Sequence, residues 1–448
     1  MNAVISLPLV GELYSYDLWV IATASLVGAL CGVLGCYLLL RRLSMLGDAI
    51  SHAILPGLAG AFLLSGSRDL AWMLLGAGVV GVLTGVFTAG LHRVAKIAED
   101  ASMGVVFTTL FALGVLLISF AARNVDLDPG CVLYGLLEFT PLDTVVIGGM
   151  SIPRATATLG AAAVVVLVVL TILHKEIKLV AFDPALAAAL GLRPTLIHFV
   201  MVALIAGVSV VSFESVGSIL VVALLVTPAA TAHLLTDRYA RLLALSAGIG
   251  AASGAGGYLL AKHVETWKVD GTALGTSAAG CVCVVGAFFF VAAALASPRH
   301  GVLSRLYRQA ALRLRISRED ILGMLYRAAE LRDTGLSTRD LRGGGGNATT
   351  LALAMLRQRG LITRADGLWR LTTEGHATAS QFVGTHRLWE SYLAARLGLP
   401  PDHVHQATHR AEHFIPPAVR EKLAQDVRSS QRSESPLTDP HGRQIPGP

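Results

Sequence analysis

The chain has 448 residues, of which 54% are hydrophobic and 15% are charged, and its mean hydropathy is +0.62. This composition excludes a chain built only from water-soluble domains. Residues 1–297 contain 14 basic and 16 acidic residues, a net charge of −2, whereas residues 298–448 contain 22 basic and 14 acidic residues, a net charge of +8. The sequence therefore predicts a membrane-embedded part followed by a basic soluble part.

Nine apolar stretches in the first part approach the length of about 20 residues that a helix needs to cross a bilayer. Pro56 and Pro228 interrupt the second and the seventh, so these two spans are expected to be bent or short. The predicted fold class is an all-α polytopic membrane protein with eight or nine transmembrane helices. The stretches lie at 18–40, 43–64, 70–91, 101–122, 155–174, 195–213, 217–236, 242–261 and 273–296.

Basic residues divide unequally between the loops on the two sides of these spans. Positive residues concentrate in cytoplasmic loops, so we assign the richer side to the cytoplasm. It holds Arg41, Arg42, Arg93, Lys96, Lys175, Lys178, Arg193, Arg238, Arg241 and Arg299. The other side holds Arg68, Arg123, Arg154, Lys262 and Lys268. We therefore expect a multi-pass protein of the plasma (inner) membrane with an outside N-terminus and a cytoplasmic C-terminal tail.

The second span carries an acid and an imidazole four residues apart, Asp48 and His52. On a helix this spacing places both side chains on one face, about one turn from each other. An ionisable group inside a bilayer normally faces an aqueous path or a partner, and an oxygen with an imidazole nitrogen suits Mn(II), Zn(II) or Fe(II). A structural Asp–His hydrogen bond and a proton relay fit the same pair, so the residues alone leave three interpretations open.

The segment that contains this pair, RRLSMLGDAISHAILPG at residues 41–57, closely resembles the signature of the manganese/zinc/iron permease family of ABC importers. The resemblance implies a membrane subunit that passes a divalent metal through the centre of a permease homodimer or paired permease, with Asp48 and His52 as metal contacts. Further segments resemble the family in the family's order, at 104–119, 182–192, 216–236 and 297–303.

The segment at 182–192, FDPALAAALGL, is similar to the family's helix that docks into the ATP-hydrolysing subunit. The resemblance assigns this docking to Phe182, Asp183, Pro184 and Gly191. An Asp and a Pro at the start also suit a short helix on the surface rather than a span.

No Walker A sequence occurs in the chain, and the glycine run at 343–346 is followed by Asn347 instead of Lys. The chain is therefore predicted to be a transport subunit and not an enzyme. The family resemblance implies that ATP is used by a separate ATP-binding subunit and that import also requires an extracytoplasmic metal-binding protein.

The soluble part follows a predicted linker at 298–316. Helical patterns from Ser317, at 337–341 and at 350–359, followed by two short strands around Gly367, have the order of a winged helix-turn-helix domain, expected over 317–380. DNA binding is the weaker expectation, because base edges are read mainly by Arg, Asn or Gln. The predicted recognition helix has no Arg or Lys before Arg357 and offers only Asn347, Thr349 and Thr350.

The remainder of the tail is rich in metal-ligand residues, and His386 and Glu390 again lie four residues apart. Residues 386–423 and 439–446 resemble the metal-binding and dimerisation region of the diphtheria-toxin-repressor family. The resemblance implies a paired metal site, although His409 replaces a Cys or Glu of the family and Gly323 replaces an acidic residue of manganese-type members. The predicted ligands are Asp320, His386, Glu390, His405, His409, Glu412 and His413. We expect this helical region at 381–427 and a polar tail at 428–448.

Together these features predict the permease subunit of an ABC importer for manganese, zinc or iron, with a cytoplasmic tail that senses the same metals. A secondary cation transporter is one alternative, but it would need internal inverted repeats, which the sequence does not show convincingly. A membrane-anchored, metal-dependent DNA-binding regulator is another, although one span would suffice for anchoring. The basic charge of the tail is expected to face protein or membrane lipid rather than DNA.

Overall fold

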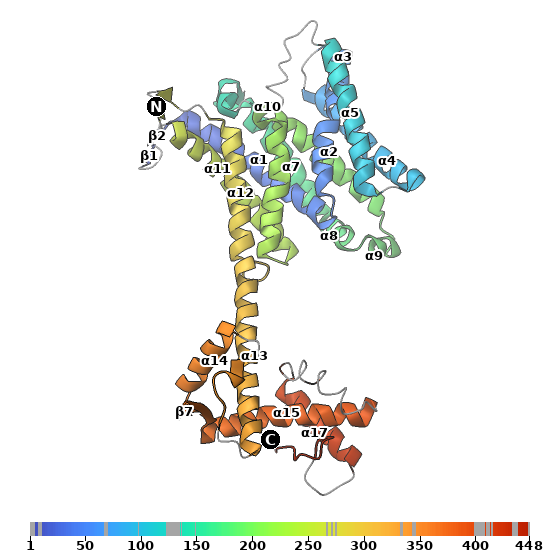
Figure 1. The fold of residues 1–448 in the computed structure, drawn as a ribbon. Coiled ribbons are helices and arrows are strands. Elements are labelled where there is room, and N and C mark those ends of the chain that lie inside the picture. The colour runs from blue at the N-terminus through green and yellow to red at the C-terminus, as the bar shows by residue number, and fades with distance from the viewer. Residues whose placement is uncertain are drawn as a thin grey trace. The chain divides into compact units, whose positions relative to one another are not determined.

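The computed structural model divides the chain into two compact units, Met1–Ser304 and Arg305–Pro448 (Figure 1). The boundary falls inside the segment 298–316 that the sequence predicts as a linker. The structure describes residues 5–7, 11–66, 70–96, 98–121, 135, 137–147, 149–265, 268–269, 272–273, 276–331, 335–342, 346–397, 408, 413, 415–431 and 438–446.

Within these described residues, nine helical stretches of the first unit are long and apolar enough to cross a membrane, and each overlaps one predicted span. The all-α polytopic fold is therefore confirmed. The stretches are Ser15–Leu40, Met45–Ser65, Ala71–His92, Ala101–Ser119, Arg154–Ile172, Pro194–Phe213, Ser215–Leu235, Tyr239–Val264 and Ala278–Ala296. The helices that carry them are α1 (Ser15–Leu40), α2 (Ser44–Ala53), α3 (Leu55–Ser65), α4 (Leu70–Ala95), α5 (Glu99–Ala121), α7 (Arg154–Ile172), α10 (Pro194–Leu235), α11 (Tyr239–Glu265) and α12 (Ala278–Ala296).

Two helix interruptions were expected at prolines, and only one is observed there. The second span divides into α2 and α3 at Ile54, close to Pro56, whose ring nitrogen cannot donate to the carbonyl of His52. Pro228 lies inside α10, and the residue of this helix with non-helical backbone angles is Gly217, with φ 75° and ψ 164°. Glycine adopts this positive φ without the steric penalty of a side chain.

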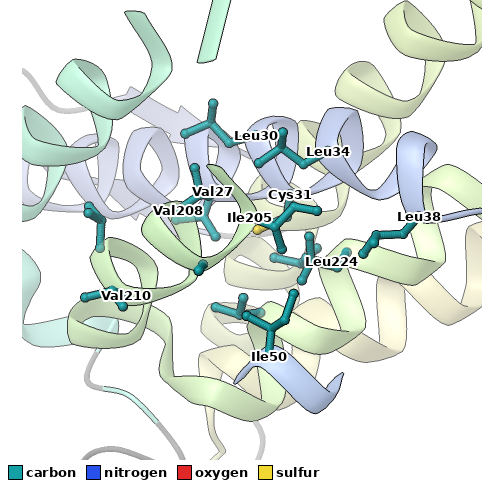
Figure 2. Close-up of a cluster of buried hydrophobic side chains, with 14 of the residues drawn as sticks. Val27, Leu30, Cys31, Leu34, Leu38, Ile50, Ile205, Val208, Val210 and Leu224 are labelled. Carbon is teal, nitrogen blue, oxygen red and sulfur yellow. The ribbon is translucent and has the colours of Figure 1, made fainter. Parts of the chain in front are cut away.

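The interior of the membrane unit is formed mainly by α1 and α10, with Ile50 of α2 packed beside them (Figure 2). Helix α1 also packs against α11 through glycines. A Cβ atom on Gly28 would lie 2.1 Å from the carbonyl oxygen of Gly250, so neither position accepts a larger side chain without separating the helices. Small residues allow such close backbone approach between helices in membranes.

Short elements connect the spans, and the sequence analysis predicted few of them. Among these, α9 is the short surface helix predicted at 182–192. The elements are the hairpins β1–β2 (Ile5–Leu7, Gly11–Leu13), β3–β4 (Thr144–Ile147, Met150–Pro153) and β5–β6 (Lys268–Val269, Thr272–Ala273), the 3-10 helix η1 (Leu137–Leu142), and helices α8 (His174–Phe182) and α9 (Pro184–Ala189).

The second unit has the predicted winged-helix order followed by longer helices. The wing is an antiparallel hairpin whose turn residues, Asp366 and Gly367, have φ values of 57° and 79°, as a tight two-residue turn requires. The helix expected at 337–341 is reduced to one 3-10 turn. The elements are α13 (Val302–Glu330), which begins in the first unit, η2 (Asp340–Arg342), α14 (Gly346–Gln358), β7 (Ile362–Ala365), β8 (Leu368–Leu371), α15 (Thr373–Leu397) and α17 (Pro417–Gln431).

Candidate functional site

Asp48 and His52 meet on one face of α2, as their spacing predicts. Oδ1 of Asp48 lies 3.3 Å from Nε2 of His52, and their side chains are 34% and 26% exposed. Two ligands of one transition metal lie about 3 to 3.5 Å apart, because each is about 2.0–2.2 Å from the ion. The pair is therefore spaced to contact one cation, and α2 holds it inside the bundle against α1, α5 and α10.

The sequence of α2 fixes the direction in which this pair points. Leu46, Ala49 and Ile50 are buried and form the apolar face of the helix. The ring of His52 meets Phe111 of α5 edge-on, with ring centroids 5.4 Å apart, and lies 6.4 Å from the ring of Phe107. These contacts hold the imidazole by packing, while its nitrogen faces the carboxylate.

The predicted docking segment forms the short helix α9 with a well-defined start and end. Asp183 caps it, since Oδ1 accepts a hydrogen bond of 2.9 Å from the backbone N–H of Leu186. Pro184 occupies the first helical position, where a missing N–H costs nothing. Gly191 ends the segment with φ 84°, and the N–H of Leu192 donates back to the carbonyl of Ala187.

An apolar row is exposed along this docking segment. Phe182, Leu186 and Leu190 are 58%, 46% and 65% exposed, and their spacing of four residues places them along one side. The ring of Phe182 also meets the ring of Tyr239 edge-on at 6.2 Å. The segment thus offers a surface for a partner while it remains attached to the start of α11.

Asp237, in the turn between α10 and α11, binds the residues that follow the last span. It accepts hydrogen bonds from Nη1 of Arg299 at 2.6 Å and from the ring of His300 at 3.2 Å. Ser297 adds a bond of 2.5 Å from its hydroxyl to the carbonyl of Leu234. The bonds from Arg299 and His300 hold the pKa of Asp237 below its ordinary value. Sequence reasoning singled out residues 297–303 but missed their acidic partner.

In the tail, His386 and Glu390 form a second pair at helical spacing, on α15. Nε2 of His386 lies 3.0 Å from Oε1 of Glu390, and the two side chains are only 6% and 4% exposed. An imidazole nitrogen and a carboxylate oxygen at this distance are again a donor set that a transition metal accepts.

His413 faces two neighbouring carboxylates of α13. Its Nδ1 is 2.7 Å from Oε2 of Glu319, and its Nε2 is 3.4 Å from Oδ1 of Asp320. Burial raises the pKa of Glu319, but the hydrogen bonds from His413 and Arg315 outweigh this effect and leave that pKa below its ordinary value. Asp320 was predicted as a ligand, whereas Glu319 was missed because its contact with His413 spans 94 residues.

Within the described part of the tail these ligand residues come together only as pairs. No group of three or more His, Cys, Asp or Glu side chains is arranged to hold a metal ion among the described residues. His405, His409 and Glu412 lie outside them. The paired metal site of seven ligands therefore stays a prediction, although the nitrogen and oxygen donors that are described fit a divalent transition metal.

A buried arginine fixes the position of α15 next to His386. Arg387 is 3% exposed and donates to Oε2 of Glu330 at 2.5 Å and to the backbone carbonyl of Gln444 at 2.6 Å. Its Nε also lies 3.7 Å from Oδ2 of Asp439. Charge-assisted bonds of this kind are strong, so α13, α15 and the closing segment 438–446 are held together beside the histidine.

The residues predicted to read DNA lie at the start of α14 and differ in their exposure to solvent. Thr349 is 4% exposed, so it cannot reach a groove of DNA in this conformation, whereas Thr350 is exposed. The side chain of Asn347 lies outside the described residues. DNA contact by these residues stays a prediction, and the burial of Thr349 argues against it.

Both parts of the chain match known protein families. Residues 14–297 match the ABC 3 transport family, and residues 372–447 match the iron dependent repressor, metal binding and dimerisation domain. The manganese transport system membrane protein MntD of Bacillus subtilis (strain 168) is 42% identical over 295 residues, which cover 66% of this chain and 96% of that protein. The zinc transport system membrane protein TroD of Treponema pallidum (strain Nichols) is 33% identical over 370 residues, covering 80% and 97%.

A solved structure agrees with these sequence matches. PsaBC from Streptococcus pneumoniae in complex with Fab is 29% identical, with a TM-score of 0.54, and the match covers 65% of this chain and 95% of that chain. The family match extends over more than half of the sequence and includes all nine spans found among the described residues. The chain is therefore a multi-pass membrane permease subunit that belongs to the ABC 3 transport family and carries a repressor-like metal-binding and dimerisation domain.

Proposed function

We propose that this permease passes Mn(II), Zn(II) or Fe(II) across the membrane and that Asp48 and His52 contact the ion on its way. The observation that carries this proposal is the separation of 3.3 Å between a carboxylate oxygen and an imidazole nitrogen on a helix packed inside the bundle. Relatives named for manganese and zinc transport support the choice of ions. Both donor types suit these borderline cations.

The surroundings of the pair favour passage over permanent binding. About a quarter to a third of each side chain is exposed, so water and a partly hydrated ion can reach both donors. Two ligands leave at least half of the coordination positions of a metal open, and an ion held in this way can leave again. The carboxylate compensates the charge of the ion, and the rings of Phe107 and Phe111 limit the movement of the imidazole.

ATP hydrolysis belongs to a separate ATP-binding subunit in this proposal. That subunit docks at α9 and its flanks, through Phe182, Asp183, Pro184 and Gly191, and the exposed apolar row of the segment supports this role. Import further requires an extracytoplasmic metal-binding protein and a second permease copy or a paired permease. We expect α9 and the tail on the cytoplasmic side of the inner membrane, because the loops on that side are the more basic ones.

The tail senses the metal that the permease imports. The buried pair of His386 and Glu390 and the contact between His413 and Asp320 provide donors for it. Arg299, which precedes the tail, is bound to Asp237. Two residues after Asp237, Tyr239 contacts Phe182 of the predicted docking segment. Metal in the tail changes transport only if it binds the active and inhibited states unequally.

The experiment that tests the transport site is ATP-dependent Mn(II) uptake in vesicles reconstituted with the ATP-binding subunit and supplied with the extracytoplasmic metal-binding protein. Asp48→Asn and His52→Gln each remove one donor, and each is expected to reduce uptake about tenfold or more, equivalent to about 1.4 kcal/mol or more. Asp143→Asn is the matched control, because Asp143 is an exposed acid that lies 3.9 Å from Arg154. Uptake that is undiminished in both donor variants would remove the proposed path site.

A further inference from the structure

The first half of α13 carries an exposed apolar row along one side. Leu303, Leu306 and Tyr307 are 58%, 55% and 75% exposed, and Ala310 is exposed as well. Their spacing of three and four residues places them on one side of the helix. The row ends at Leu314, which is partly buried against the hydrophobic core of the tail. Residues 303–310 therefore form an apolar surface that the described part of the chain leaves largely uncovered.

The same stretch of α13 is strongly basic. Residues 302–318 contain no Asp or Glu, and their arginines are Arg305, Arg308, Arg313, Arg315 and Arg318. At about 3.6 residues per turn, Arg305 and Arg308 lie on the side of the helix opposite the apolar row. A helix with Leu and Tyr on one side and Arg on the other is typical of segments that lie at a membrane surface and bind anionic lipid.

The start of α13 is fixed next to the end of the last span. Helix α12 ends at Ala296, and α13 begins at Val302. The hydroxyl of Ser304 donates to the backbone carbonyls of Ser297 and Gly301, at 2.9 Å each. A Cβ atom on Gly301 would lie 2.4 Å from the carbonyl oxygen of Ser297, so this turn is too tight for a larger residue. The apolar row thus begins within a few residues of a membrane-spanning helix.

We propose that residues 302–313 bind the anionic surface of the bilayer, with the apolar row below the lipid headgroups and the arginines at the lipid phosphates. Arginine can bury its methylene groups in apolar surroundings and keep its guanidinium beside a phosphate. Charge favours lipid over a second copy of this chain, because two copies would bring like charges together with no acid from 302 to 318 to balance them. The inference does not rest on the proposed transport or sensing function.

The test measures how far a spin label on α13 enters the bilayer, by electron paramagnetic resonance. Oxygen concentrates among lipid chains and a nickel chelate stays in water, so their relative access to the label reports its depth. The full-length chain is placed in nanodiscs of equal parts phosphatidylglycerol and phosphatidylcholine. Labels are attached to Leu306→Cys and Ala310→Cys on the apolar row and to Leu312→Cys on the opposite side. The parent chain, treated with the same label, gives the background of the native cysteines.

Oxygen is expected to reach the labels at positions 306 and 310 better than nickel does, and the label at 312 should show the reverse. Each arginine near an anionic surface contributes about fivefold to binding, so Arg305→Gln with Arg313→Gln should lower the ratio of lipid-bound to water-exposed segment about tenfold or more. Phosphatidylcholine alone should lower the same ratio. Arg357→Gln with Arg359→Gln removes equal charge from exposed positions outside this stretch and should leave the labels unchanged.

Three results would overturn the proposal. Nickel access at 306 and 310 equal to that at 312 would show that the row faces water. Exclusion of both oxygen and nickel, with magnetic coupling between labels on two copies, would show that a second copy covers the row. Immersion that is unchanged in phosphatidylcholine and in the variant with Arg305→Gln and Arg313→Gln would show that the arginines do not bind lipid headgroups. Failure of the transport proposal is measured separately, as vesicle uptake in the Asp48→Asn and His52→Gln chains.

Discussion

Two helices, α2 and α15, each carry a carboxylate and a histidine four residues apart, and these two pairs differ in burial. Asp48 and His52 on α2 lie 3.3 Å apart and are 34% and 26% exposed, whereas His386 and Glu390 on α15 lie 3.0 Å apart and are 6% and 4% exposed. Spacing decides that two donors meet, and burial decides how easily an ion exchanges. The open pair suits an ion that passes, and the closed pair suits one that is held.

The neighbours of the closed pair also restrict movement more than the neighbours of the open pair do. Phe107 and Phe111 limit the movement of His52 through ring contacts. Beside His386, the buried Arg387 binds Glu330 and the carbonyl of Gln444. A charged network of this kind fixes one geometry, whereas aromatic packing tolerates small movements of an imidazole.

The largest effect is expected when the support of the closed pair is removed. Arg387→Ala leaves Asp439, which is 2% exposed, without its buried cation, and breaking such a pair costs about 3–5 kcal/mol. Limited proteolysis at increasing temperature measures the unfolding of the tail. The tail of Arg387→Ala should unfold at a clearly lower temperature than that of the wild type. Arg443→Ala changes an exposed arginine of the same segment and should have little effect. Equal melting of both variants would show that the network does not stabilise α15.

A smaller effect is expected from changing a donor of the closed pair without removing its shape. Glu390→Gln should weaken Mn(II) binding by the tail about tenfold, or about 1.4 kcal/mol, because an amide oxygen is a poorer ligand than a carboxylate. Equilibrium dialysis of the full-length Asp48→Asn chain, with and without Glu390→Gln, measures this loss. The Tm should change little, and an affinity equal to that of the parent would assign the pair a purely structural role.

At the open pair, the aromatic contact can be changed alone. Phe111→Leu removes the edge-on ring next to His52, and such ring contacts contribute about 0.5–1.5 kcal/mol. We expect Mn(II) uptake at subsaturating metal to fall by a factor of about two to ten, well below the loss in His52→Gln. Phe288→Leu, an exposed ring on α12, is the control. A full loss of uptake in Phe111→Leu would show that the ring has a more direct role than packing.

The smallest effect concerns the bonds that precede the tail. Because the folded pKa of Asp237 lies below its ordinary value of 3.8, its bonds to Arg299 and His300 stabilise the fold above that value and are lost as the pH falls through the lower folded pKa. Wild type and Asp237→Asn should therefore differ slightly in Tm at pH 7, and the difference should disappear only when the pH has fallen below the folded pKa, which itself lies below 3.8. A difference that persists under those acidic conditions would contradict an ionic origin.

The sequence alone was sufficient for features that depend on local pattern. Each predicted span overlaps an observed one, the wing turn lies at Gly367, and Asp183 caps the predicted short helix α9. The positive φ of Gly217 inside α10 was not predicted, because a single glycine in an apolar run gives no local signal of a break.

Contacts between distant residues could not be predicted in this way. Glu319, Asp237 and Glu330 reach partners that lie 57 to 94 residues away in the sequence. Each is an ordinary charged residue in its own segment, and only the fold brings its partner to it. Residues 297–303 and 439–446 were recognised as motifs, but the acids and the arginine that they contact were not.

The most direct test of the difference between the two pairs is Mn(II) uptake into vesicles loaded with increasing Mn(II) on the side of the tail. The wild type should transport rapidly at low internal metal and slow as the internal concentration rises. Glu390→Gln should start at the same rate and slow far less, and Asp48→Asn should show little uptake at any concentration. Normal uptake by Asp48→Asn, or identical slowing of Glu390→Gln and wild type, would contradict the assignment of passage to one pair and sensing to the other.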